Sequence, residues 1–178
     1  MKWAAAIFSL GFIASNVYAA PAPGLDLFRL KIASNEQSIN GRYLSSNASI
    51  LGIYDSDDIS PVRVYQTSSE KTGCSQLHTY PIGIVDHALA LVGSNGLMAL
   101  TDMVNPAGTK PDDGRAMEWD TFRVADSKLT NDGKGTWVAF PTKTSWTVKW
   151  TDGSAFMTTD YMPVEIVMEA AGEGRHNE

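Results

Sequence analysis

The sequence predicts a single all-β domain, and three observations carry this prediction. Beyond the first nineteen residues, apolar and polar residues alternate with a period of two in most apolar runs, and helical periodicity is almost absent. Asn-Gly and Asp-Gly pairs separate several of these runs. About eleven short strands in one domain need closed or covered edges, so we expect an antiparallel β-barrel or a β-trefoil-like domain, with a β-sandwich as the alternative.

The first nineteen residues are typical of a secretory signal peptide. Met1-Lys2 gives a positive start, residues 3–13 are almost unbroken apolar sequence, and Val17-Tyr18-Ala19 has small residues where a cleavage site needs them. This apolar run is too short for a bilayer core of about 30 Å, which needs roughly 20 helical residues. We therefore expect cleavage after residue 19, a secreted protein and no membrane partner.

The rest of the chain divides into a short leader at 20–26, a β domain at 27–169 and a flexible polar tail at 170–178. In the first strand, Phe28, Leu30 and Ile32 share one face because successive strand side chains point to opposite sides. Asn95-Gly96 predicts a tight hairpin turn, since both residues accept positive φ. The strands expected in this half are 27–32, 50–54, 62–66, 77–80, 82–85, 88–92 and 97–101.

A surface loop is predicted at 105–115, which holds two prolines, two glycines and few apolar residues. A turn is expected at Asn131-Asp132-Gly133 and a hairpin turn at Asp152-Gly153. The strands expected in this half are 119–124, 136–140, 145–150 and 164–168.

The charge balance argues against nucleic acid as a partner. The chain has 14 basic and 20 acidic side chains, with a formal net charge of −6, and its basic residues are scattered singly. Such a surface repels both nucleic acid and anionic lipid.

Cys74 is the only cysteine, so no disulfide can form within the chain and stability must come from packing. We interpret it as a free thiol that packs as a small hydrophobe. An intermolecular bridge is the second interpretation. A catalytic thiolate is the third, because only His78 is close in sequence to lower the pKa of the thiol.

Several short motifs resemble one family of secreted fungal proteins. They are Phe28-Arg29-Leu30 with Ser34, the small residues 47–52, Cys74, the strands 89–92 and 96–101, and the aromatic segments 119–124, 137–141 and 146–150. The family includes the cell-wall protein of phialide development, IgE-binding proteins and elicitors of the hypersensitive response. The resemblance implies a small β-barrel or trefoil-like domain, wall-associated or released, without a known active site. This chain has Phe140 where the family places a cysteine before a proline, and it lacks the family's other disulfides.

Four features of the sequence are candidate functional sites. Asn47-Ala48-Ser49 is the one N-glycosylation sequon, and we expect a glycan on Asn47. Asp55, Asp57 and Asp58 provide too few ligands for calcium, and the histidines do not form a metal site, so no metal and no cofactor are expected. No serine nucleophile motif occurs, and the adjacent Asp86 and His87 point apart if they lie on a strand. A carboxylate pair for glycoside hydrolysis could come from residues near strand ends, namely Glu118, Asp120, Asp152, Asp160 and Glu165.

The tryptophans divide into core and surface candidates. Trp146 and Trp150 share one strand face, so both are expected in the core. Trp119 and Tyr161 are the better candidates for exposed platforms that bind sugar rings.

These observations lead to one functional prediction with two alternatives. We expect a secreted, non-enzymatic, fungal-type glycoprotein that acts at the cell wall or outside the cell, binding wall glycan or being sensed as an effector or elicitor by a host receptor. The alternatives are a small extracellular polysaccharide hydrolase and a structural cell-wall component. The oligomeric state is left open.

Overall fold

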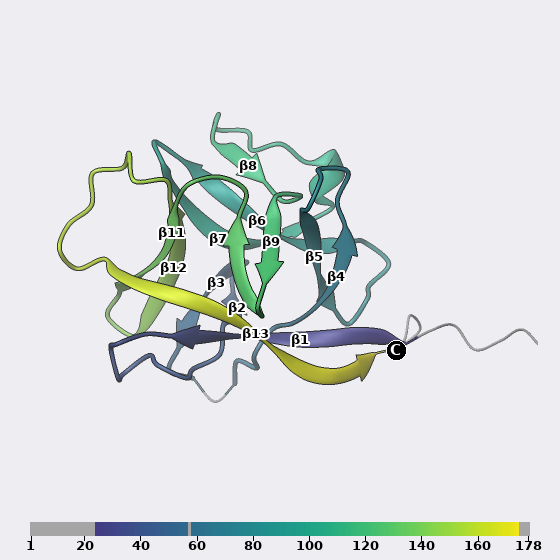
Figure 1. The fold of residues 1–178 in the computed structure, drawn as a ribbon, viewed down its shortest axis with the longest axis horizontal. Coiled ribbons are helices and arrows are strands. Elements are labelled where there is room, and N and C mark those ends of the chain that lie inside the picture. Colours follow the sequence, from purple (N-terminus) through teal and green to yellow (C-terminus); the bar gives the residue numbers. More distant parts are fainter. Residues whose placement is uncertain (1–23, 57, 175–178) are drawn as a thin grey trace, which may run out of the picture.

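The computed structural model describes residues 24–56 and 58–174, and these residues form a closed antiparallel barrel of nine strands with four further strands attached (Figure 1). Following the pairings, the nine strands close in the order β1-β4-β5-β6-β7-β3-β12-β11-β13 and back to β1. They span β1 Leu25–Ala33, β3 Ile50–Tyr54, β4 Arg63–Ser68, β5 Ser75–Tyr80, β6 His87–Ser94, β7 Leu97–Val104, β11 Thr136–Pro141, β12 Ser145–Thr151 and β13 Met162–Gly174.

The four additional strands extend the barrel wall. They are β2 Ser45–Asn47, β8 Ala116–Glu118, β9 Phe122–Ala125 and β10 Lys128–Asn131. β2 pairs with β3, β8 pairs with β6, and the β9–β10 hairpin bridges β5 and β13. The barrel prediction is confirmed. Within the described residues the helical structure is the single 3₁₀ turn η1, Pro106–Gly108, and no helix there is long and apolar enough to cross a membrane.

The long strand β13 closes the barrel and corrects the expected domain limits. It pairs with β11 near its start, with β10 at its middle, and with β1 from Glu165 to Gly174. Residues 170–174, expected to be a flexible tail, are therefore strand, and β1 begins at Leu25 within the expected leader. The alternation of polar and apolar residues fades there, but main-chain pairing does not require it. The expected signal peptide, residues 1–19, lies outside the described residues.

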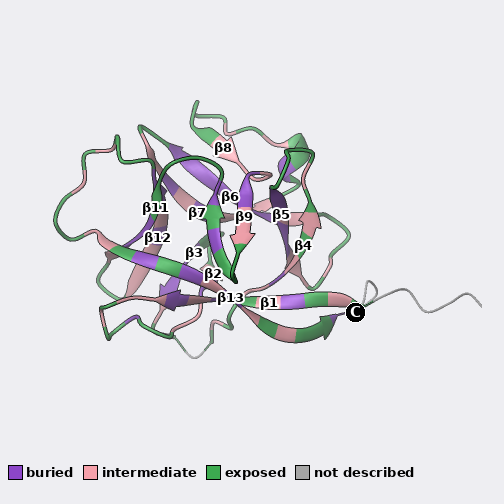
Figure 2. Cartoon of the chain, in the orientation of Figure 1, coloured by how far each residue is buried: buried purple, intermediate pink, exposed green. Residues whose placement is uncertain are grey.

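The barrel interior is a continuous apolar core (Figure 2). Trp137 and Trp150 meet edge to face in it, with ring centroids 5.1 Å apart. The Trp137 indole Nε1 donates a 2.6 Å hydrogen bond to the Leu129 carbonyl, which satisfies the one polar atom of that ring. Trp150 is 5% exposed, which confirms the core prediction for it, whereas Trp146 is only partly buried and packs against the core from outside.

Most predicted strands are present, and the differences are local. The Asn95-Gly96 turn is confirmed, with φ of 53° and 73°. Residues 82–85 form a loop instead of a strand, and β2, β8 and β10 were not predicted. Asp152-Gly153 does not close a hairpin, because β12 pairs with β11, β3 and β7 while β13 pairs elsewhere.

Candidate functional site

Trp119 lies in a bend between β8 and β9, not in the strand that the sequence predicted at 119–124. The bend is fixed on both sides of the indole. Glu118 Oε2 accepts a 2.7 Å hydrogen bond from Asn131 Nδ2 on β10. Asp120 Oδ1 accepts a 3.0 Å hydrogen bond from Lys71 Nζ, and this bond raises the pKa of Lys71. The two carboxylates flanking Trp119 therefore anchor the bend to the barrel wall.

His78 on β5 provides the inner support for the Trp119 ring. The two rings meet edge to face with centroids 6.4 Å apart. His78 is itself held tightly, since Nδ1 lies 2.7 Å from Asp86 Oδ1, Nε2 lies 3.1 Å from Thr67 Oγ1, and the imidazole stacks on Tyr65. The half-buried indole thus rests on a side-chain network that limits its movement.

One edge of Trp119 borders a surface hollow of about 430 Å³, which we call the Trp119 hollow. Its walls come from the loop around η1, from β8 and from the Trp119 bend: Pro106, Ala107, Thr109, Lys110, Pro111, Arg115, Met117, Trp119 and Asp120. Lys110 makes no ion pair with any described residue. Arg115 binds Asp113 through Nε at 2.7 Å, which leaves its terminal nitrogens free to donate. The hollow therefore combines an aromatic ring with free donors and one carboxylate.

The structure places Tyr161, the second predicted platform, in a different setting. Its ring packs on Phe140 of β11 with centroids 4.7 Å apart, and Lys149 Nζ lies 3.3 Å from its hydroxyl and 5.5 Å from its ring centroid. Tyr161 is absent from the lining of the Trp119 hollow. Its ring is engaged by its own neighbours, and it does not share a hollow with Trp119.

The other two predicted sites, Asn47 and Cys74, differ in their exposure to solvent. Asn47 is exposed at the end of β2, where Ala48 and Ser49 form a tight turn with φ of 48° and 68°. An oligosaccharide on Asn47 would thus project from a hairpin tip. Cys74 is a free thiol only 6% exposed. Its Sγ lies 3.9 Å from the Thr72 carbonyl.

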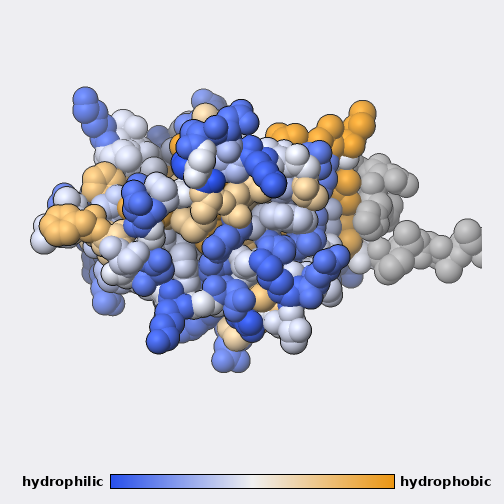
Figure 3. Space-filling view, turned by 90° about the horizontal axis from the view of Figure 1, so that it is seen from above, coloured by the Kyte–Doolittle hydropathy of each residue, from blue (hydrophilic) through white to orange (hydrophobic). Residues whose placement is uncertain are grey.

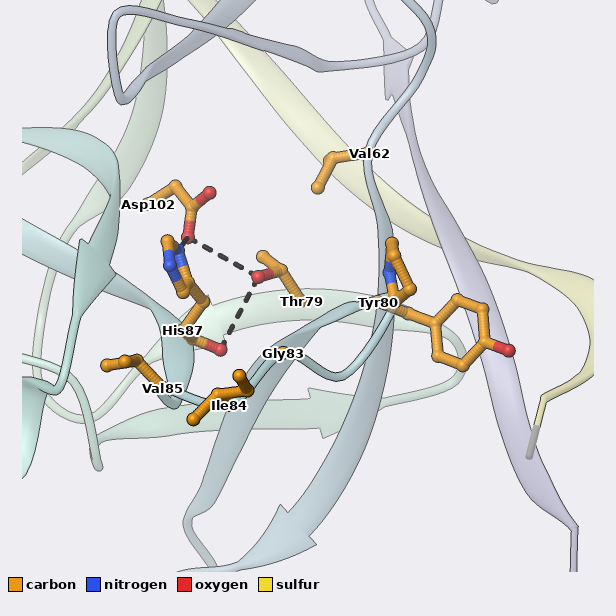
Figure 4. Close-up of a pocket in the computed structure, with 9 residues that line it drawn as sticks. Val62, Thr79, Tyr80, Gly83, Ile84, Val85, His87 and Asp102 are labelled. Atoms are coloured by element: carbon orange, nitrogen blue, oxygen red, sulfur yellow. Dashed lines mark hydrogen bonds and ion pairs between the residues drawn. The ribbon is translucent and has the colours of Figure 1, made fainter. Parts of the chain in front are cut away.

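A second hollow, of about 480 Å³, opens beside the loop that joins β5 to β6, and we call it the β5–β6 hollow (Figure 4). Its apolar lining comes from Val62, Tyr80, Pro81, Ile84 and Val85, and its polar lining from Thr79, His87 and Asp102. The strand predicted at 82–85 is this loop, and the Tyr80–Pro81 peptide that begins it is cis. The volume is in the range of small-molecule sites, about 300–1,000 Å³.

Two histidine–aspartate pairs flank the β5–β6 loop, and sequence reasoning missed both. Asp86 contacts His78, whereas His87 Nδ1 lies 3.4 Å from Asp102 Oδ1 on β7. The neighbours Asp86 and His87 do not pair with each other, and each finds a partner on an adjacent strand. Pro81 and Gly83 were the signals that could have indicated a loop here.

No group of three metal-binding side chains occurs among residues 24–56 and 58–174. Each hollow contains one carboxylate, Asp120 in the first and Asp102 in the second. Neither lining supplies the two facing acids of a glycoside hydrolase.

Comparison with known proteins gives no relative: no protein-family description, no curated sequence and no solved structure matches this chain.

Proposed function

We propose that this protein is a non-enzymatic glycan-binding domain that acts outside the cell, and that the Trp119 hollow is its binding site. The observation that supports this most directly is the half-buried indole at the rim of a hollow with free polar groups. A pyranose ring has an apolar face of C–H groups, which suits an aromatic ring, and a rim of hydroxyls, which need donors and acceptors. Trp119 would provide the first contact.

The polar groups of the hollow suit hydroxyl recognition. Lys110 and the terminal nitrogens of Arg115 can donate, and the second oxygen of Asp120 can accept. The support beneath Trp119 also favours binding, because a ring already fixed by His78 loses little freedom when a sugar stacks on it. Extracellular location and sensing by a host remain predictions from the sequence.

The proposal is tested by measuring retention of the protein on insoluble chitin, β-1,3-glucan and cellulose, together with release of reducing sugar. We expect binding to at least one polysaccharide without release of sugar. Trp119→Ala should weaken that binding at least about thirtyfold, as truncation of a central tryptophan does at an interface. Trp119→Phe should retain part of it.

Phe156→Ala is the matched control, because Phe156 is a fully exposed aromatic residue that does not line the hollow. Retention that survives Trp119→Ala, or that falls equally in both variants, would refute the site. Release of sugar would favour the hydrolase alternative instead. Failure to bind any polysaccharide would favour a structural wall component.

A further inference from the structure

The β5–β6 hollow has the composition of a ligand site and is independent of the proposed glycan site. Most of its wall is apolar, and its polar groups come from three neighbouring strands: Thr79 on β5, His87 on β6 and Asp102 on β7. Figure 4 shows these three side chains gathered on one side, with Val62 across from them and Ile84 and Val85 on the loop below. Sites for small organic molecules have this division between an apolar wall and a few convergent polar groups.

The apolar lip of this hollow is unusually exposed. Ile84 is fully exposed at the loop tip and Val85 is 48% exposed, and both line the hollow. Outside the lining, Val104, which pairs with His87 across β6 and β7, is 49% exposed. Figure 3 shows that the most hydrophobic surface gathers towards one end of the molecule and is not scattered evenly. An apolar ligand would remove this surface from water, which is favourable by roughly 25 cal/mol per Å².

The surroundings of Asp102 indicate which head group of a ligand this hollow would bind. Its carboxylate is only 20% exposed, yet its two contacts in the hollow are long: His87 Nδ1 and Thr79 Oγ1 both lie 3.4 Å away. The single Thr79 proton is shared with the His87 carbonyl, also at 3.4 Å, so it satisfies one acceptor at a time. A largely buried carboxylate is costly unless it is paired.

The lining offers Asp102 no permanent cation, and its one titratable partner there is His87, whose Nδ1 lies 3.4 Å away. The lining contains no lysine or arginine. Arg63 on β4 is held 4.8 Å over the Tyr80 ring, and Figure 4 shows that ring turned away from Asp102. Asp86, at the end of the same loop, is outside the lining and its carboxylate is paired with His78, so Asp102 is the one carboxylate of the hollow. An anionic ligand would therefore be repelled, and a cationic one attracted.

We propose that the β5–β6 hollow binds a small molecule with an apolar body and a primary ammonium head. The body packs on Val62, Pro81 and Val85, and the ammonium group donates charge-assisted hydrogen bonds to Asp102, which are stronger than those of a neutral hydroxyl.

The test uses three soluble ligands that share an aromatic body and differ in the head group: phenethylamine, 2-phenylethanol and 3-phenylpropanoate. Affinities are measured by calorimetry on the full chain at neutral pH, and NMR shift changes locate the site. We expect the amine to bind most tightly, the alcohol more weakly and the carboxylate most weakly, with shifts centred on residues 79–87 and 102. Asp102→Asn should lower the amine affinity about tenfold and leave the alcohol nearly unchanged.

Two further variants keep the result decisive. Asp160→Asn removes the same charge from an exposed residue outside the hollow and should not change amine binding. Val85→Lys places a tethered ammonium at the exposed lip, so it should abolish amine binding even if Asp102→Asn fails to fold. Equal affinity for the three ligands, equal losses in the two aspartate variants, or shifts located elsewhere would overturn the proposal.

Discussion

The barrel interior and the Trp119 hollow use tryptophan in opposite ways. Inside, Trp137 and Trp150 are only 2% and 5% exposed and meet edge to face, so almost none of their ring surface is open to a ligand. Trp119 also makes an edge-to-face contact, with His78, but it lies in a bend outside the regular strands and borders an open hollow. The same side chain stabilises the fold in one place and is available to a ligand in the other. Strand alternation identifies the tryptophans that pack in the core, and the interruption of a strand identifies the one that is available to a ligand.

The largest expected difference is in stability. Trp137→Ala removes a buried ring and leaves a cavity, so it should lower the free energy of unfolding by about 3–5 kcal/mol. Trp119→Ala should lower it by about 1 kcal/mol. Urea denaturation measures both. If Trp137→Ala does not fold, Trp137→Phe, which leaves the Leu129 carbonyl without its donor, should cost about 1–3 kcal/mol. Equal losses at positions 119 and 137 would remove the distinction between the two environments.

The next effect concerns the support beneath Trp119. His78→Ala removes the partner of Asp86 and creates a space under the indole of Trp119. The free energy of unfolding should therefore fall by about 1–3 kcal/mol. Near-ultraviolet circular dichroism should also change, because the indole loses its fixed neighbour. His87→Ala is the control, since that ring is 42% exposed in its pair with Asp102 and should cost less than about 1 kcal/mol. An unchanged aromatic spectrum in His78→Ala would show that Trp119 does not depend on this support.

A smaller effect is expected at Tyr161. Its ring packs on Phe140 beneath Lys149, so Tyr161→Ala should cost about 0.5–1.5 kcal/mol of stability. Glycan retention should change by less than about twofold, which is the small effect expected of a residue outside the binding site. Loss of retention comparable to that of Trp119→Ala would show that Tyr161 belongs to a binding platform after all.

Sequence patterns were sufficient for the barrel but not for the two hollows. The run 164–168 folds as predicted because burial of one sheet face enforces the period of two. The runs 50–54 and 136–140 are also strands as predicted, but each of them buries three consecutive residues. The short strands β8 and β10 hold too few apolar residues to be predicted: β8 has none in the core cluster, and β10 alternates in burial but contributes only Leu129. The pairing of His78 with Asp86 and of His87 with Asp102 depends on strand register between neighbours, which one sequence does not specify. Trp119 was predicted as exposed, but its hollow depends on the loop around η1, whose path the sequence left open.

The smallest expected effect on stability is on the outer face of the barrel, where an ion pair, and not the packing of rings, stabilises the strands. Glu169 on β13 accepts hydrogen bonds from the Tyr43 hydroxyl and from Lys31 Nζ, the latter at 2.9 Å, and these contacts lower the pKa of Glu169. A carboxylate whose pKa is lower in the folded state stabilises the fold above its unfolded pKa, and this contribution is lost as the pH falls through its folded pKa. Glu169→Gln should therefore lower the melting temperature slightly at pH 6 to 7, and the difference from the parent should shrink as the pH falls below the ordinary glutamate pKa of about 4.3 and vanish below the lowered folded-state pKa. Glu70→Gln, at an exposed position without a charged partner among the described residues, should show no such pH dependence. A difference that persists unchanged in acid would mean that Glu169 stabilises the β1–β13 pair by packing, as the tryptophans do inside, and not by its charge.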